Sequence, residues 1–168
     1  NMFNDKANQV VGDEKISFYG QHQSGIATPV QKNVYFAVLD LHSLNKEEIK
    51  QMFKDWTDYS EKLMKGELVA PELANHLVPP LDTGETVGLN PYRLTITFGI
   101  SPSFLDKLKM DNKKMEEFKD LPHFPRDQIK DKYKGGDICI QACADDAQVA
   151  FHAVRNLVRT KEKKNGKC

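Results

Sequence analysis

The stretch of sequence that decides the fold runs from Asp137 to Val158 and reads DICIQACADDAQVAFHAVRNLV. Its first eight residues, 137–144, are rich in apolar side chains and predict a strand. Two aspartates follow, and apolar residues then recur at helical spacing through residue 158. A strand followed directly by an amphipathic helix predicts a domain that contains both kinds of element.

The two aspartates are predicted to begin this last helix. Asp145 or Asp146 would cap its N-terminus, because a carboxylate accepts hydrogen bonds from the free backbone N–H groups there. An adjacent pair of aspartates also resembles an acidic catalytic site, but helix capping is the simpler interpretation. The helix is predicted to end near Arg159, and Thr160–Cys168 to form a Lys-rich solvated tail.

Three further elements are predicted upstream. Val34–Leu41 (VYFAVLDL) is rich in β-branched and aromatic residues, which predicts a buried strand. Asn45 and Glu48 form an N-x-x-E capping box before an amphipathic helix that spans residues 46–65. Arg93–Gly99 alternates apolar and polar residues, which predicts a strand packed on one side.

The remaining segments are predicted to be loops or short helices. Residues 1–33 are polar and contain several glycines, and they predict an extended or disordered N-terminal arm. Residues 66–92 are rich in proline and glycine, as connecting loops are. Ser101-Pro102 begins a short helix, and residues 109–134 form a charged insertion broken by two prolines.

The predicted order of elements is therefore β-α-β, an insertion, and β-α. This order matches an α+β, ferredoxin-like βαββαβ domain, an antiparallel sheet with helices on one face, except that the last strand is missing. Without a fourth strand, one edge of the sheet would be unpaired and open to another chain. We expect residues 34–168 to form this domain behind the arm of residues 1–33, and the chain to be part of a longer protein.

The composition excludes some classes of function. The chain has 24 basic and 24 acidic residues, so its net charge is zero. Nucleic-acid-binding proteins usually have a basic excess, and a neutral chain has no general attraction to anionic membranes. The longest apolar run, Val34–Leu39, is six residues, whereas a membrane helix needs about 20. We expect neither a nucleic-acid partner nor a membrane span.

The residues that could bind metal or act as nucleophiles are scattered. Cys139 and Cys143 lie in one predicted strand, about 13 Å apart, which is too far for a disulfide or a shared metal ion. Arg155 and Arg159 are one helical turn apart and would either bind a carboxylate or phosphate or form a basic face that is exposed or turned toward another domain. The histidines lack metal-ligand spacing and stand at positions 22, 42, 76, 123 and 152. The residues alone indicate no catalytic site.

Several segments together resemble one family, the dye-decolorising peroxidases, and in particular the N-terminal half of its deferrochelatase-type subgroup. Order and spacing match from residue 16 to 159. The matching segments are FYGQHQSGIATP (18–29), the strand 34–41, PPLDTG (79–84), LTITFG (94–99) with Ser103-Phe104, Phe124-Pro125, GGDICIQACADD (135–146) and QVAFHAVRNLVR (148–159).

The resemblance implies a peroxidase built from two ferredoxin-like domains. Its haem b would be bound mainly by residues of the second domain. It places a distal aspartate in a G-x-x-D-G motif soon after the first domain, and a distal arginine and the haem-ligating histidine later. Gly135-Gly136-Asp137 is not that motif, because it precedes the third strand of the first domain. The resemblance therefore assigns no catalytic, haem-binding or metal-binding residue to this chain.

Three hypotheses remain for the function. In the first, the chain is half of a haem peroxidase, inactive alone, that partners its own C-terminal haem domain and forms a homo-oligomer. This subgroup is associated with iron recovery from haem and with twin-arginine export, which implies an extracytoplasmic location, although a cytoplasmic one stays open. In the second, the chain is a stand-alone module that dimerises through its open sheet edge. The third, a small independent enzyme, lacks a polar cluster to support it.

Overall fold

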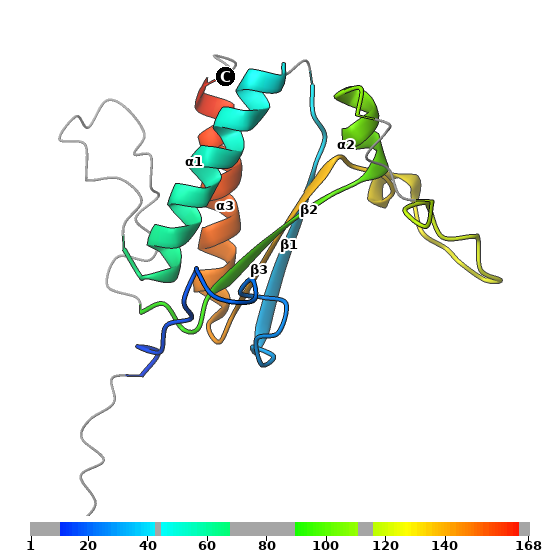
Figure 1. Ribbon diagram of the computed structural model, residues 1–168. Coiled ribbons are helices and arrows are strands. Elements are labelled where there is room, and N and C mark those ends of the chain that lie inside the picture. Colours follow the sequence, from blue (N-terminus) through cyan, green and yellow to red (C-terminus); the bar gives the residue numbers. More distant parts are fainter. Residues whose placement is uncertain (1–10, 43–44, 68–89, 111–115, 165–168) are drawn as a thin grey trace, which may run out of the picture.

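The computed structural model describes residues 11–42, 45–67, 90–110 and 116–164. Its three-stranded antiparallel sheet has the order β1-β3-β2 and consists of β1 (Asn33–Leu39), β2 (Thr95–Ile100) and β3 (Ile138–Ala144). Two long helices, α1 (Lys46–Met64) and α3 (Ala147–Lys164), cover one face of the sheet, and the short α2 (Pro102–Lys107) lies near one end of it (Figure 1). This is the arrangement of a ferredoxin-like α+β domain, as predicted.

The first helix begins and ends where local sequence signals predict. The Asn45 side chain accepts a hydrogen bond from the Glu48 N–H at 2.9 Å, and the Glu48 carboxylate accepts one from the Asn45 N–H at 2.8 Å. This capping box satisfies two backbone donors that the helix itself leaves unpaired. Gly66, with φ +75°, follows the last turn in the left-handed conformation that ends many helices.

The last helix is longer than its sequence predicts. Its cap is Asp146, whose Oδ1 accepts hydrogen bonds from the N–H groups of Gln148 and Val149 at 2.9 and 3.1 Å. The prediction of a solvated tail from Thr160 is wrong for residues 160–164, because the helix continues to Lys164; residues 165–168 lie outside the described part of the chain. No helix in the described ranges is both long and apolar enough to cross a membrane.

The core lies between the sheet and its two long helices. The β3 side chains that face the helices are at most 1% exposed: Ile138, Ile140, Ala142 and Ala144. The ring of Trp56 in α1 stacks on Phe98 of β2, with their centroids 5.2 Å apart, and its indole N–H donates to the Leu157 carbonyl in α3 at 2.9 Å. One side chain therefore ties both helices to the sheet.

The prediction that Val34–Leu41 forms a buried strand is wrong in two respects, the end of the strand and the burial of one face. The strand ends at Leu39, and β3 is its only neighbour in the described residues. Val34, Phe36 and Val38 point away from the helices and are 64, 54 and 51% exposed. The sequence is apolar on both faces, but only the face toward the helices is covered.

The second strand differs from its prediction in the opposite direction. It was expected to pack on one side only, yet Thr95, which faces away from the helices, is buried. The Gln31 side chain in the N-terminal arm donates to Thr95 Oγ1 at 2.9 Å, and Gly25 lies directly against Thr97. The arm therefore covers the β2 part of this face and leaves the β1 part open.

Candidate functional site

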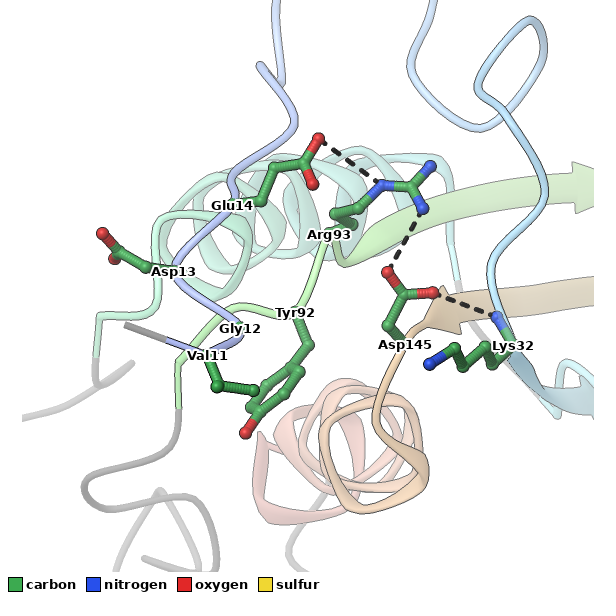
Figure 2. Close-up of a pocket in the computed structure, with 8 residues that line it drawn as sticks. All are labelled: Val11, Gly12, Asp13, Glu14, Lys32, Tyr92, Arg93 and Asp145. Atoms are coloured by element: carbon green, nitrogen blue, oxygen red, sulfur yellow. Dashed lines mark hydrogen bonds and ion pairs between the residues drawn. The ribbon is translucent and has the colours of Figure 1, made fainter. Parts of the chain in front are cut away.

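Charged side chains gather where the N-terminal arm meets the start of β2 and the end of β3 (Figure 2). Arg93 Nη1 lies 3.2 Å from Asp145 Oδ2, and Arg93 Nε lies 3.7 Å from Glu14 Oε1. Asp145 Oδ1 accepts a hydrogen bond from the backbone N–H of Lys32 at 3.2 Å. Together with Val11, Gly12, Asp13 and Tyr92, these residues line a pocket of about 330 Å³.

The backbone beneath this cluster is unusual. Tyr92 and Arg93 both have positive φ, 45° and 54°, a region that residues other than glycine seldom adopt. Their N–H groups donate to the carbonyls of Gly12 and Glu14 at 2.8 and 2.9 Å, and the Tyr92 carbonyl accepts from the Asp145 N–H at 2.8 Å. These bonds hold the two residues in place and fasten the arm to both strands.

This Arg93–Asp145 cluster fastens the arm and does not have the geometry of a catalytic pair. Arg93 contacts the carboxylates of Glu14 and Asp145, and it also donates through Nη2 to the Pro29 carbonyl at 3.0 Å. Both ends of the segment 11–32 therefore meet at one guanidinium, whose donors are directed to groups of the protein itself. Sequence analysis missed this role because Arg93 and Asp145 are 52 residues apart.

The middle of the arm is held against α1 by a second polar contact. The Tyr19 hydroxyl donates to Glu61 Oε2 at 3.2 Å, and Lys65 Nζ contacts the other oxygen of Glu61 at 2.8 Å. The hydrogen bond to Glu61 raises the pKa of Tyr19, and the bond from Lys65 lowers the pKa of Glu61. Tyr19 therefore remains a protonated donor and Glu61 a charged acceptor at neutral pH.

A buried carboxylate joins α2 and the residue Leu41 after β1 to the start of β3, at the other end of the sheet. Asp137 is 1% exposed and accepts three hydrogen bonds: from Lys107 Nζ at 2.6 Å, from the Leu41 N–H at 2.6 Å and from Ser103 Oγ at 2.5 Å. Burial raises the pKa of Asp137, but these three donors together outweigh it, so the pKa lies below its usual range. The only sequence signal was a charged residue directly before an apolar strand.

The predicted polar candidates are not brought together by the fold. Asp146 caps α3 and Asp145 binds Arg93, so the adjacent aspartates have separate structural partners. Arg155 is exposed and lies over the Phe151 ring, 5.8 Å from its centroid, while Arg159 is half-buried. The hypothesis that these arginines grip an anion stays a prediction.

The histidines and cysteines are likewise dispersed. His22, His42 and His123 are exposed, and His76 lies outside the described residues. His152, predicted to be a boundary residue, is 3% exposed and hydrogen-bonds to Asn156 at 3.0 Å. The described ranges hold no group of three or more His, Cys, Asp or Glu side chains arranged to bind a metal ion.

The sheet surface that faces away from the helices is covered by the N-terminal arm only over β2, and its β1 side chains remain exposed. We call it the open face, and it consists of Val34, Phe36 and Val38 of β1, Thr95, Thr97 and Gly99 of β2, and Cys139, Gln141 and Cys143 of β3. Its β1 side is apolar and exposed. Contiguous apolar surface of this kind marks an interaction site more often than a free surface.

Comparison with known proteins agrees with this fold. The family model for the N-terminal region of Dyp-type peroxidases matches residues 23–164. The chain belongs to the Dyp-type peroxidase family. It is 31% identical to the deferrochelatase of Escherichia coli K12 over 149 residues, and to that of E. coli O157:H7 over 152 residues.

Solved structures of the same family superpose on most of the chain. DtpA from Streptomyces lividans has a TM-score of 0.78 and 32% identity over 88% of this chain, and a DyP-type peroxidase from Streptomyces coelicolor has a TM-score of 0.77 and 32% identity over the same share. These matches confirm the ferredoxin-like fold class. The chain covers 38% of each structure and 35–36% of the two deferrochelatases, so it spans about a third of the length of these relatives.

Proposed function

We propose that this chain is the N-terminal domain of a longer haem peroxidase, in which it supplies a docking scaffold and not the reacting groups. The observation that carries the proposal is the contrast between the two faces of its sheet. One face is sealed by α1 and α3, while Val34, Phe36 and Val38 on the other are more than half exposed. A second domain packed on the open face would bury them, as strands with two apolar faces require.

The described residues do not fit a haem. A pocket that holds both a histidine and large apolar side chains is lined by His123, but Leu121 and Tyr133 in the same lining are 81 and 72% exposed. A haem iron needs an axial ligand inside an apolar, enclosed site. Haem b would therefore be held by the C-terminal domain of the longer protein.

The free edge of β1 would receive the fourth strand of the βαββαβ arrangement. An unpaired edge presents a row of backbone N–H and C=O groups that a further strand satisfies. The same edge favours the alternative function, a stand-alone module in which two copies pair edge to edge. Sedimentation of the 168-residue chain over a range of concentrations would distinguish a defined dimer from a monomer.

The intact protein would use peroxide to oxidise organic substrates or take part in releasing iron from haem, as a homo-oligomer. Two relatives are named deferrochelatases, and this supports the second of these activities. Export by the twin-arginine route and an extracytoplasmic location belong to the same proposal. Haem peroxidase chemistry needs an axial histidine and a distal acid, and both would come from the second domain.

The decisive experiment is the intact mass and absorption spectrum of the natural gene product, purified from its host. We expect a polypeptide more than twice as long as the 168 residues here, with a haem Soret band and peroxide-dependent dye oxidation. A natural product of the same length as this chain, without haem, would show the proposal to be wrong. The dimeric module would then be the better interpretation.

A further inference from the structure

A second apolar surface lies outside the sheet, on the loop of residues 116–134 between α2 and β3. Four large apolar side chains on this loop are exposed by more than half: Leu121, Phe124, Ile129 and Tyr133. They help to line a cavity of about 540 Å³. Single exposed apolar residues are ordinary, but four around one hollow indicate a contact surface.

The loop has a defined shape. The Asp127 N–H donates to the Phe124 carbonyl at 3.0 Å, and the Asp127 side chain accepts from the Phe124 N–H at 3.1 Å, so this turn is closed from both sides. Further along, η2 (Asp131–Tyr133) forms a helical turn, and Lys134 Nζ lies 3.1 Å from Asp131 Oδ1. A preshaped loop loses less conformational entropy on binding than a flexible one.

The position of the loop points to what covers it. It extends from the sheet on the side away from α1 and α3, which is the side of the open face (Figure 1). At its base, Gly136 is packed so closely against Val38 that a β-carbon there would overlap the valine side chain. Val38 is itself part of the open face, so the base of the loop adjoins that face.

The charge of the loop argues against a highly charged partner. Residues 116–134 contain five acidic and five basic side chains, which cancel. Such a segment gives no net electrostatic attraction to nucleic acid or to an anionic membrane. Apolar contact is then the principal driving force for binding.

We propose that the 116–134 loop packs against the flank of the same domain that docks on the open face, so that the loop and the sheet hold one partner between them. This inference rests on the proposed function, because the partner is the remainder of the longer polypeptide. The loop makes the interface two-sided. It sets the orientation of the docked domain, which the open face alone leaves free to slide along the strands.

Photo-crosslinking in the full-length gene product tests the inference. A p-benzoylphenylalanine replaces Phe124 in one variant and Phe36 in a second, and Lys50 on the exposed side of α1 serves as the control position. We expect the Phe124 and Phe36 variants to crosslink within one polypeptide to segments beyond residue 168. The Lys50 variant should give no such product.

The two proposals fail in different ways in this experiment. A crosslink from position 36 without one from position 124 overturns the loop inference and leaves the docked domain in place. The absence of both overturns the proposed function as well. A crosslink from position 124 that joins two copies shows that the loop binds a second molecule, which also overturns the inference.

Hydrogen exchange gives a second readout on the unmodified full-length protein. Exchange at residues 121–129 should be at least tenfold slower than in the Leu121→Ser/Phe124→Ser variant, which loses the apolar contact. Val11→Ser/Ile26→Ser removes two similarly exposed apolar residues from the N-terminal arm, and it should leave exchange in the loop unchanged. Equal exchange in all three proteins contradicts the inference.

Discussion

The two faces of one sheet differ sharply, although both are built from apolar strands. On the helix side, Ile140 and Ala142 of β3 are fully buried. On the open face, Phe36 and Val34 of β1 remain 54 and 64% exposed. Since both sets belong to the same hydrogen-bonded ladder, backbone pairing does not account for the difference. Among the described residues, two helices pack against the first face, whereas the β1 part of the second face has no covering element.

The two faces of the sheet contribute differently to the stability of the fold and to binding. Burial of apolar area stabilises a fold by about 25 cal/mol per Å², so the helix side supplies most of the stability of the domain. Apolar side chains that remain exposed contribute little to folding and become useful only when another surface covers them. Substitutions on the helix side should therefore lower the free energy of unfolding, whereas substitutions on the open face should leave it nearly unchanged and weaken binding.

The largest expected effect is on the helix side. Trp56→Ala removes a fully buried ring together with its hydrogen bond to Leu157 and should cost about 4 kcal/mol of unfolding free energy. Phe36→Ala, on the open face, should change that free energy by less than about 0.5 kcal/mol. Urea denaturation followed by circular dichroism measures both.

If Trp56→Ala prevents folding, Trp56→Phe provides a milder variant that keeps a ring in the stack on Phe98. It should still be less stable than the parent chain. A loss for Phe36→Ala as large as that for Trp56→Ala would contradict the comparison, because it would make the open face part of the core.

The next effect concerns the buried carboxylate at the end of the sheet. Asp137→Asn removes the charge that pairs with Lys107, and it should cost about 2 kcal/mol at neutral pH. Asp131→Asn provides the matched control, because Asp131 pairs with Lys134 in the same region but is 99% exposed. Thermal and urea unfolding at pH 7 should leave the control unchanged.

Asp137 also predicts a dependence of stability on pH. Although burial raises its pKa, the bonds from Lys107, Ser103 and Leu41 lower it further, so the folded pKa lies below the unfolded value of about 3.9. The stabilisation is then fully present above pH about 5 and is lost as the pH falls through the folded pKa. Asp137→Asn should reduce the loss of unfolding free energy at acid pH. An unchanged loss in this variant would show that other carboxylates cause it.

A comparable effect is expected where the long loop joins the sheet. Gly136 has φ +102° and no room for a β-carbon beside Val38, whereas Gly135 has φ +83° and open space around it. Gly136→Ala should therefore cost about 2 kcal/mol and Gly135→Ala about 1 kcal/mol, the latter from backbone strain alone. Urea denaturation measures both losses of unfolding free energy. Equal losses would mean that the Val38 side chain moves aside to make room for the new β-carbon at position 136.

The sequence predicted those parts of the fold that local signals specify. The Asn45–Glu48 capping box and the apolar stripe of α1 are confirmed, and so are the strand predicted at 137–144 and the cap at Asp146. In each case the interacting residues lie within a few positions of one another. Their geometry therefore follows from helix and strand periodicity alone.

The interactions that sequence analysis missed are those between distant residues. Arg93 and Asp145 are 52 positions apart, and Lys107 and Asp137 are 30 apart, so no local pattern pairs them. The exposure of β1 was missed for a different reason. Its sequence is apolar on both faces, but the described residues cover only the face toward the helices, and the pattern itself does not tell which face is covered.

The smallest effects separate two neighbouring aspartates at the edge of the core. Asp145→Ala and Asp146→Ala should each cost about 1 kcal/mol, the first by breaking a partly exposed ion pair and the second by removing a helix cap. Global stability cannot tell them apart, but hydrogen exchange can. Asp145→Ala should speed exchange in the arm at residues 12–32, while Asp146→Ala should affect only the first turn of α3 at Gln148 and Val149. Asp145 binds both Arg93, which contacts the arm at Glu14 and Pro29, and the N–H of Lys32. An arm that stays protected in Asp145→Ala would therefore show that the backbone bonds from Tyr92 and Arg93 are sufficient without the ion pair.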